Sequence, residues 1–146
     1  MATGTKWTST VIVDSIKTTP EVIVNSDKSR PIKVFDSQSL SPSEIAQYTA
    51  ISGHYSAGIV TVSATYDSSA TSGVRIRWLY SPNGSLFDSP EDAINEGNYK
   101  DLTFSAGETR TRTIIIPFLQ PYVRVQIVNL DSSCSVTIDC YHTYFK

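Results

Sequence analysis

Hydrophobic and polar residues alternate strictly along residues 74–80, which is the clearest structural pattern in the chain. The even positions hold valine, isoleucine, tryptophan and tyrosine, whereas the odd positions hold two arginines and a leucine. Successive side chains of a strand point to opposite faces, so this segment is predicted to be a strand with one buried face. The sequence Ser81-Pro82-Asn83-Gly84 follows directly and favours a chain reversal. The combination is typical of an antiparallel sheet.

Short runs of β-branched and aromatic residues recur along the chain and predict eight or nine strands in total. Besides 74–80, the runs cover residues 11–15, 22–26, 32–35, 60–66, 102–104, 110–116, 123–127 and 136–140. Turn-favouring residues separate these runs, and no long helical pattern lies between them. Such spacing predicts an all-β fold, a two-sheet antiparallel β-sandwich with jelly-roll-like or Greek-key connections. An eight-stranded closed barrel is the alternative.

Two segments carry the signals of short helices in loops. Residues 41–48 begin with serine at the N-cap and proline at the first helical position, and Glu44 completes a capping box. The apolar residues that would share one face of this helix are Ile45, Tyr48 and Ile51. The same pattern recurs from Ser89, with Gly97 placed to end the helix. Both helices would be too short to persist without packing against the sandwich.

The length of 146 residues predicts one domain at residues 7–146, behind a flexible arm at residues 1–6 that has nothing to bury. No apolar run approaches the ~20 residues of a membrane span, and no secretory signal opens the sequence. Cys134 and Cys140 would lie roughly 20 Å apart on one extended strand, too far apart for a disulfide. The net charge of −2 argues against nucleic acid as a partner.

Two runs, residues 11–13 and residues 114–116 with Phe118 and Leu119 after them, are apolar at odd and even positions alike. A strand with one buried face needs apolar residues at only every second position. One parity of each run can enter the core, and the other would form an exposed patch of the kind that marks interfaces. The sequence therefore predicts a homo-oligomer of closed cyclic symmetry, with one or both runs at the contact. The candidate interface residues are Val11, Ile12, Val13, Ile114, Ile115, Ile116, Phe118 and Leu119.

Five of the six arginines fall on predicted strands, whereas the lysines fall mostly in turns or near the termini. If these strands are neighbours, their outer faces form a basic stripe suited to phosphate or carboxylate. Alternatively, the arginines keep the outer face solvated and pair with acidic residues across strands. The five residues are Arg75, Arg77, Arg110, Arg112 and Arg124.

Aromatic residues in loops or at outward parity offer a second type of binding surface. A sugar-binding site stacks its ligand on exposed rings, which combine an apolar face with a polar edge. The candidates for such stacking are Trp7, Tyr48, Tyr55, Tyr99 and Tyr141.

No catalytic or metal-binding constellation is recognisable, so we expect no enzyme activity and no cofactor. Residues 54–58 lack the first glycine of a nucleophile elbow and precede a predicted strand rather than a helix. Neither His54 nor His142 has a carboxylate at recognisable spacing. Residues 67–73 are predicted to be a turn, because the glycine and glutamate positions of a calcium loop are not met.

Four short motifs in the C-terminal half occur in a characteristic order: YSPNG at 80–84, SAG at 105–107, PYVRV at 121–125 and NLD at 129–131. This order resembles that of small β-sandwich structural or decoration proteins of phage and archaeal virus particles. The resemblance implies a role in assembly or decoration, commonly as a symmetric oligomer, and brings no catalytic residue with it. Because no secretory signal and no disulfide are expected, we expect the protein in the cytoplasm or in a virus particle.

We therefore expect a non-enzymatic structural or interaction module that self-associates or decorates a larger assembly such as a virus particle. A carbohydrate-binding β-sandwich module is the main alternative, because outward aromatic rings would serve it. The oligomeric state and the surface distribution of the rings distinguish the two hypotheses.

Overall fold

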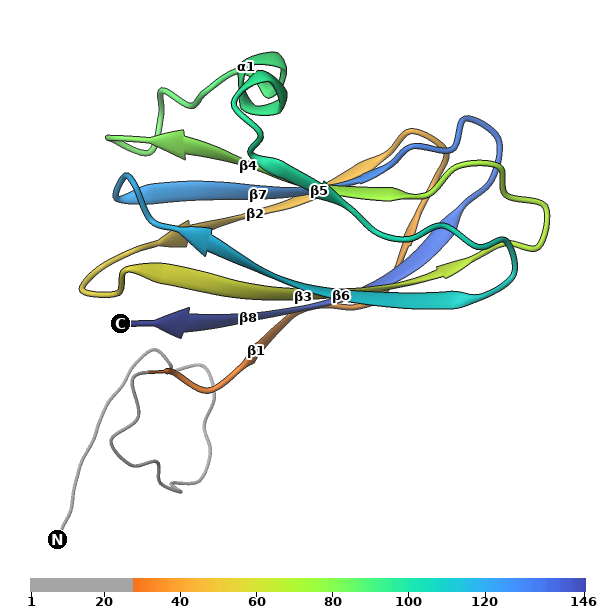
Figure 1. Cartoon of the computed structure of the whole chain (residues 1–146), viewed down its shortest axis with the longest axis horizontal. Helices are drawn as coiled ribbons and strands as arrows, with labels where there is room; N and C mark the ends of the chain where they lie inside the picture. Colours follow the sequence, from red (N-terminus) through yellow and green to blue (C-terminus); the bar gives the residue numbers. More distant parts are fainter. Residues whose placement is uncertain (1–27) are drawn as a thin grey trace, which may run out of the picture.

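The structure, a computed structural model, describes residues 28–146 and contains eight strands and one short helix (Figure 1). In chain order these are β1 (Ile32–Leu40), β2 (Ile45–Ile51), β3 (Ala57–Tyr66), β4 (Val74–Ser81), α1 (Pro90–Asn95), β5 (Tyr99–Asp101), β6 (Thr109–Pro117), β7 (Tyr122–Asn129) and β8 (Val136–Phe145). The predicted arm at 1–6, the boundary at residue 7 and the predicted strands at 11–15 and 22–26 lie outside the described residues.

The strands form two antiparallel four-stranded sheets, in the orders β1-β8-β3-β6 and β2-β7-β4-β5, which stack as two layers (Figure 1). Their pairing is nested: β1 pairs with β8, β2 with β7, β3 with β6, and β4 with β5. Four nested pairs folded across two sheets make a jelly roll. The prediction of a two-sheet sandwich is confirmed, and the closed barrel is wrong, because each sheet ends in two edge strands.

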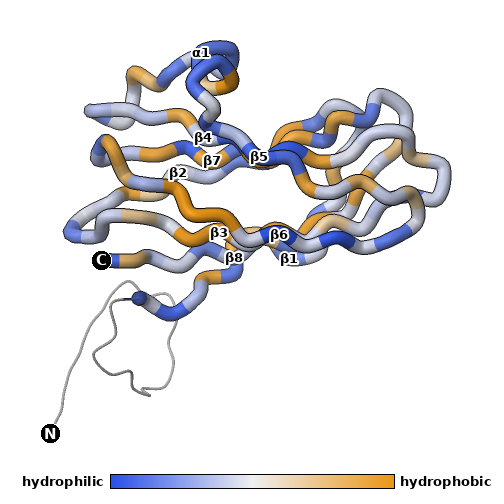
Figure 2. The backbone as a smooth tube through the Cα atoms, viewed as in Figure 1, coloured by the Kyte–Doolittle hydropathy of each residue, from blue (hydrophilic) through white to orange (hydrophobic). Residues whose placement is uncertain are grey.

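The core lies between the two layers and is built by alternate residues of each strand. On β4 the even residues face inward as predicted, and Trp78 is only 5% exposed. Leu79 has the opposite parity and is nevertheless buried, because α1 packs against the outer side of β4. Hydrophobic stretches lie along the strands of both layers, whereas β5 is hydrophilic (Figure 2).

The predicted helix at 41–48 is wrong, because this segment is a tight turn followed by β2. One of the two hydrogen bonds of a capping box does form: the Ser41 N–H donates to Glu44 Oε1 at 2.7 Å, whereas the Glu44 N–H donates to the Ser41 carbonyl oxygen. However, Ser43 adopts a positive φ of 65°, which a helix cannot continue. From Ile45 onward the period is two, and the strand pairs along its whole length with β7. Pairing with a distant strand thus overrides the local helix signal.

The second predicted helix is confirmed as α1. Ser89 is its N-cap and accepts the Asp92 N–H at 3.1 Å, and Gly97 follows the helix with φ of 80°. Ala93 is the buried residue of the helix, which fixes it on the sandwich.

Removing the cap of α1 is expected to destabilise the protein modestly. Ser89→Ala should lower the free energy of unfolding by about 1 kcal/mol, because one helix N–H loses its acceptor. Urea unfolding monitored by circular dichroism measures the loss. Ser85→Ala, an exposed serine of the preceding loop, is the matched control and should change stability by less than about 0.5 kcal/mol. Equal losses in both variants would contradict the capping role.

Three of the four edge strands carry features that hinder pairing with another chain. β1 has register shifts on either side of Phe35, and β5 is only three residues long. On β6, Arg110 and Arg112 share the parity of the buried Ile114 and Ile116, so charged side chains stand on the inner side of this edge. Bulges, short length and inward charge all discourage strand addition. β2 is the regular edge among residues 28–146.

Asp131 links the loop before β4 to the loop before β8, at the end of the sandwich where β7 ends. Its carboxylate is buried and accepts the backbone N–H groups of Thr71, Ser72, Ser133 and Cys134 at 2.6–2.9 Å. These hydrogen bonds hold the pKa of Asp131 well below its ordinary value. The predicted turn at 67–73 is thereby fixed to the loop that precedes β8.

Candidate interaction surface

The structure divides the candidate interface residues between the core and the surface. Ile114 and Ile116 are 7% and 0% exposed, so their predicted place at an interface is wrong: they belong to the core. Ile115 and Leu119 are 67% and 70% exposed and remain available for a contact. Phe118 is half-buried and packs against the core. Val11, Ile12 and Val13 lie outside the described residues.

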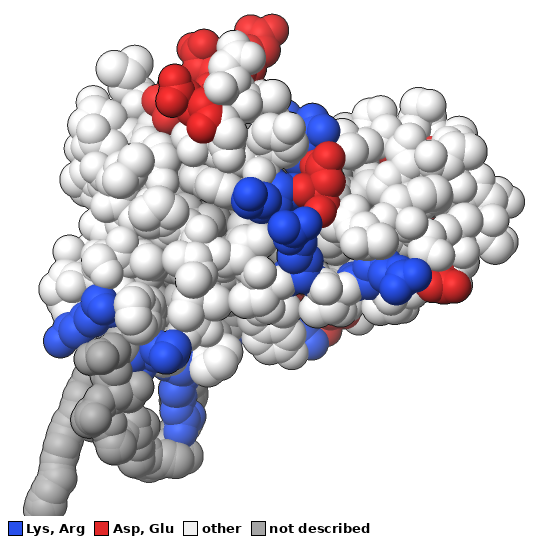
Figure 3. Space-filling model, viewed as in Figure 1, with Lys and Arg blue, Asp and Glu red and all other residues white. Residues whose placement is uncertain are grey.

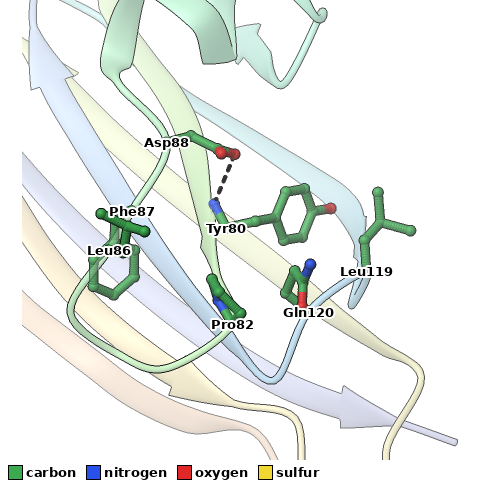
Figure 4. A pocket seen from close by; sticks show the side chains of 7 residues that line it. All are labelled: Tyr80, Pro82, Leu86, Phe87, Asp88, Leu119 and Gln120. Carbon is green, nitrogen blue, oxygen red and sulfur yellow. Dashed lines mark hydrogen bonds between the residues drawn. The ribbon is translucent and has the colours of Figure 1, made fainter.

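Leu119 lies beside a shallow groove of about 370 Å³ at the end of the sandwich where β4 and β6 finish (Figure 4). The groove, called the end groove below, is lined by Tyr80, Pro82, Leu86, Phe87, Asp88, Leu119 and Gln120. Leu86 and Leu119 stand on opposite sides of it and are 71% and 70% exposed. These two side chains are the most exposed of the large hydrophobic residues that the structure describes.

The loop that presents Leu86 is held by its own polar residues. The Ser81 hydroxyl accepts the Gly84 N–H at 2.8 Å, and Asn83 Oδ1 accepts the Leu86 N–H at 2.9 Å. Gly84 has a φ of 81°, as the predicted turn requires. Farther along, Asp88 Oδ2 accepts the Tyr80 N–H at 3.1 Å, which ties the loop back to β4 (Figure 4). The exposed leucine is therefore carried on a fixed support.

Sequence reasoning missed Leu86, because an isolated apolar residue among turn residues has no periodic pattern around it. The turn itself was predictable, and so was the apolar excess at Leu119. What was not predictable is that the two loops meet at one end of the jelly roll, which depends on the pairing of distant strands.

The five strand arginines do not form one stripe on one outer face, and that prediction is wrong. Arg75, Arg77 and Arg124 belong to one sheet, whereas Arg110 and Arg112 belong to the other. Arg124 lies 3.9 Å from the ring centre of Phe87, and Arg110 pairs with Glu108 at 2.9 Å.

Two arginines from different sheets nevertheless meet at one residue, Asp101. The Arg75 guanidinium donates two hydrogen bonds, of 2.7 and 3.1 Å, to the two carboxylate oxygens of Asp101. Arg112 reaches across from the other sheet and donates to the Asp101 carbonyl oxygen at 2.9 Å. Pairing with acidic residues across strands, the alternative considered above, thus holds for Arg75.

The aromatic candidates are dispersed rather than coplanar. Tyr48 faces inward and packs on the core, so its predicted outward position is wrong. Tyr55 stacks on His54 and contacts the tilted ring of Tyr144. Tyr99 and Tyr141 lie on separate strands, with Arg75 over the ring of Tyr99 and Lys33 over the ring of Tyr141. Trp7 lies outside the described residues.

Tyr48 belongs to a buried polar pair between the layers. Its hydroxyl shares a hydrogen bond of 2.8 Å with His142 Nδ1, and His142 is 2% exposed. Burial lowers the pKa of His142 to about 4 and raises that of Tyr48 well above its ordinary value. Gly58 makes room for the imidazole, since a Cβ there would lie 2.7 Å from the ring. His142 is buried and Tyr48 is half-buried, so the pair forms part of the packing between the layers.

Other candidate chemistry is sparse in residues 28–146. No group of three or more His, Cys, Asp or Glu side chains is placed there to hold a metal ion. Cys134 and Cys140 are both free thiols, and burial raises the pKa of Cys140 to about 12. Within the same residues, no helix has the length and apolarity that crossing a membrane requires.

The sequence matches no protein-family model and no curated protein. Among solved structures, the chain is similar to part of a family GH115 4-O-methyl-alpha-glucuronidase with specificity for decorated arabinogalactans. The identity is 8%, over 97% of this chain and 20% of that chain, with a TM-score of 0.46. This chain thus spans about a fifth of that enzyme's length, and a likeness this distant carries no argument about function.

Proposed function

We propose that this protein is a non-enzymatic assembly module that associates with further copies of itself through the end groove. The observation that carries the proposal is the pair Leu86 and Leu119, which expose 71% and 70% of their surface on opposite sides of one groove. Exposed apolar residues gathered at one place are typical of protein interfaces. A single leucine in solvent would need no explanation, but two that flank a groove do.

The jelly-roll topology is compatible with this role, because viral capsid and lectin domains use the same architecture. This is an analogy at the level of the fold, and function is decided by the surface. The surface offers a groove for a protein side chain and a loop held by internal hydrogen bonds. Such features suit a subunit that decorates or builds a larger assembly such as a virus particle.

Replacing the two leucines is expected to abolish self-association at micromolar concentration. The double variant Leu86→Asp/Leu119→Asp should weaken association at least about tenfold, because it removes buried apolar area and places charge at the contact. Sedimentation velocity should show the wild type above the 16.1 kDa monomer and the variant at the monomer.

The matched control is Leu130→Asp, an exposed leucine in the loop at the opposite end of the sandwich, which should associate like the wild type. A wild-type protein that remains a monomer across the micromolar range would refute the proposal.

A carbohydrate-binding module is the second candidate, and Tyr141 is the residue that favours it. Its ring is 39% exposed on an outer face where Thr61 and Thr113 join their hydroxyls at 2.8 Å. A ring beside a row of hydroxyls can stack and hydrogen-bond a sugar. A monomer that binds a glycan array, and loses that binding in Tyr141→Ala, would replace the assembly proposal with this one.

A further inference from the structure

Two patches of opposite charge lie on the same face of the molecule. Figure 3 shows acidic side chains gathered over α1 and basic side chains gathered over β5, with largely uncharged surface between them. The acidic patch, called the acidic knob, consists of Glu91, Asp92 and Glu96. All three are exposed, and α1 has no basic residue in its last turn to offset them.

The basic patch, called the basic ledge, consists of Arg75 and Arg77 on β4, Lys100 on the paired strand β5, and Arg112, which contacts β5 from β6. It is assembled by topology rather than by sequence neighbourhood. β4 and β5 pair so that Arg75 lies opposite Asp101 and Arg77 opposite Tyr99. Arg112 arrives from the other sheet and donates to the Asp101 carbonyl oxygen.

The positive charge of the four basic side chains exceeds the negative charge of the carboxylate that contacts them. Asp101 is the carboxylate that engages it, and Arg75 already satisfies this group with two hydrogen bonds. Lys100 lies opposite the core residue Ile76, and Arg112 has the inner parity of β6, so both side chains stand at the edge between the sheets, where they are exposed. Burial and the neighbouring charge of Arg75 lower the pKa of Arg77, which is consistent with cations crowded in one place.

We infer that the occupant of the basic ledge is the acidic knob of a second copy of this chain, which sets the orientation of the self-association proposed above. This inference rests on that proposed function. Because both patches lie on one face, a two-fold axis between them brings each knob onto the other ledge at the same time. The chain's net charge is only −2, so attraction between the patches is not overwhelmed by repulsion of whole molecules.

The knob and the end groove are adjacent in the chain, so we expect the apolar contact and the charged contact at the knob to form together. Leu86 and Asp88 line the groove, and α1 begins two residues after Asp88. Apolar burial in the groove supplies affinity, and paired charges supply register and exclude wrong partners.

The experiment exchanges charge between the two patches. One variant, Glu91→Lys/Glu96→Lys, makes the knob basic, and the other, Lys100→Glu/Arg112→Glu, makes the ledge acidic. These four residues are exposed and lie outside the Ser89 cap and the Arg75–Asp101 pair, and the contact that the ledge variant loses is the hydrogen bond from Arg112 to the Asp101 carbonyl oxygen. Thermal melts of each variant verify that the fold persists before sedimentation velocity is measured at low and high salt.

Each variant alone should associate at least about tenfold more weakly than the wild type, because both of its contacts become repulsive. An equimolar mixture of the two variants should recover association, because each reversed patch meets its complement. Salt should weaken the wild-type contact, since these charges are exposed and screened.

Several results would overturn the inference. Single variants that associate like the wild type would show that these patches are outside the contact, while the leucine variants still decide the proposed function. A mixture that fails to recover, or loss in the ledge variant alone, would show that the ledge takes a different acidic group. A wild-type monomer would refute both the inference and the function on which it rests.

Discussion

Trp78→Ala is expected to lower the free energy of unfolding by about 3–5 kcal/mol, the largest effect of any single truncation considered for this chain. The side chain is 5% exposed and belongs to the core between the two layers. The variant loses the free energy gained by burying a large aromatic ring. It also leaves a cavity that the packed core can fill only in part. Urea unfolding followed by circular dichroism measures the change in midpoint at constant slope.

Thr49→Ala on β2 is the control for this experiment. Thr49 is exposed, on the outer side of a strand whose inner residues are Ala46, Tyr48 and Ala50. Its truncation should alter stability by no more than about 0.5 kcal/mol. A Trp78→Ala variant that loses less than about 1 kcal/mol would mean that the ring is not part of the core.

Acid is expected to destabilise the protein by about 3 kcal/mol between pH 6.5 and pH 4 through His142. Burial lowers the pKa of His142 from 6.5 in the unfolded chain to about 4 in the fold. In this window the unfolded state binds the proton and the folded state does not, so stability is full above pH 6.5 and declines as pH falls. Urea titrations at several pH values measure the slope.

His142→Asn is the variant that tests this assignment, because an amide next to Tyr48 cannot titrate. Its stability is expected to be nearly flat between pH 6.5 and pH 4, whatever its absolute value. His54→Asn, at an exposed histidine, should keep the wild-type slope. Parallel profiles for His142→Asn and the wild type would contradict the prediction. The lowered pKa of Asp131 acts in a separate window, because its contribution is lost only below its ordinary pKa of 3.8.

The strands with strict alternation could be predicted from the sequence, because parity is a local property. β4 shows this best: Trp78 was placed in the core from its neighbours alone, and the structure buries it. β2 shows the limit. The turn before it, from Ser41 to Glu44, carries the sequence of a capping box, and only pairing with β7, which lies far along the chain, makes the following residues a strand. The local sequence around β2 carries no information about a pairing partner some 75 residues away.

The surface was less predictable than the fold, because it depends on which strands become neighbours. Ile114, Ile115 and Ile116 are identical in type, and only the register with β3 decides that the middle one faces solvent. Likewise, Arg75 and Arg112 are 37 residues apart and meet at Asp101 because β5 and β6 are edges of facing sheets. The separation of acidic knob and basic ledge could not be read from charge counts.

The features that hinder pairing at β1, β5 and β6 limit how many copies can join by backbone hydrogen bonds between edge strands. Within residues 28–146, β2 is the edge that is neither short, bulged nor lined by inward charge, so each copy offers one strand for backbone pairing. A subunit with one such edge can pair its backbone with one partner only, and the combined sheet cannot be extended further. Cross-β fibrils need two open edges per molecule to grow. Backbone pairing through β2 is therefore expected to stop at two copies rather than to propagate into a fibril.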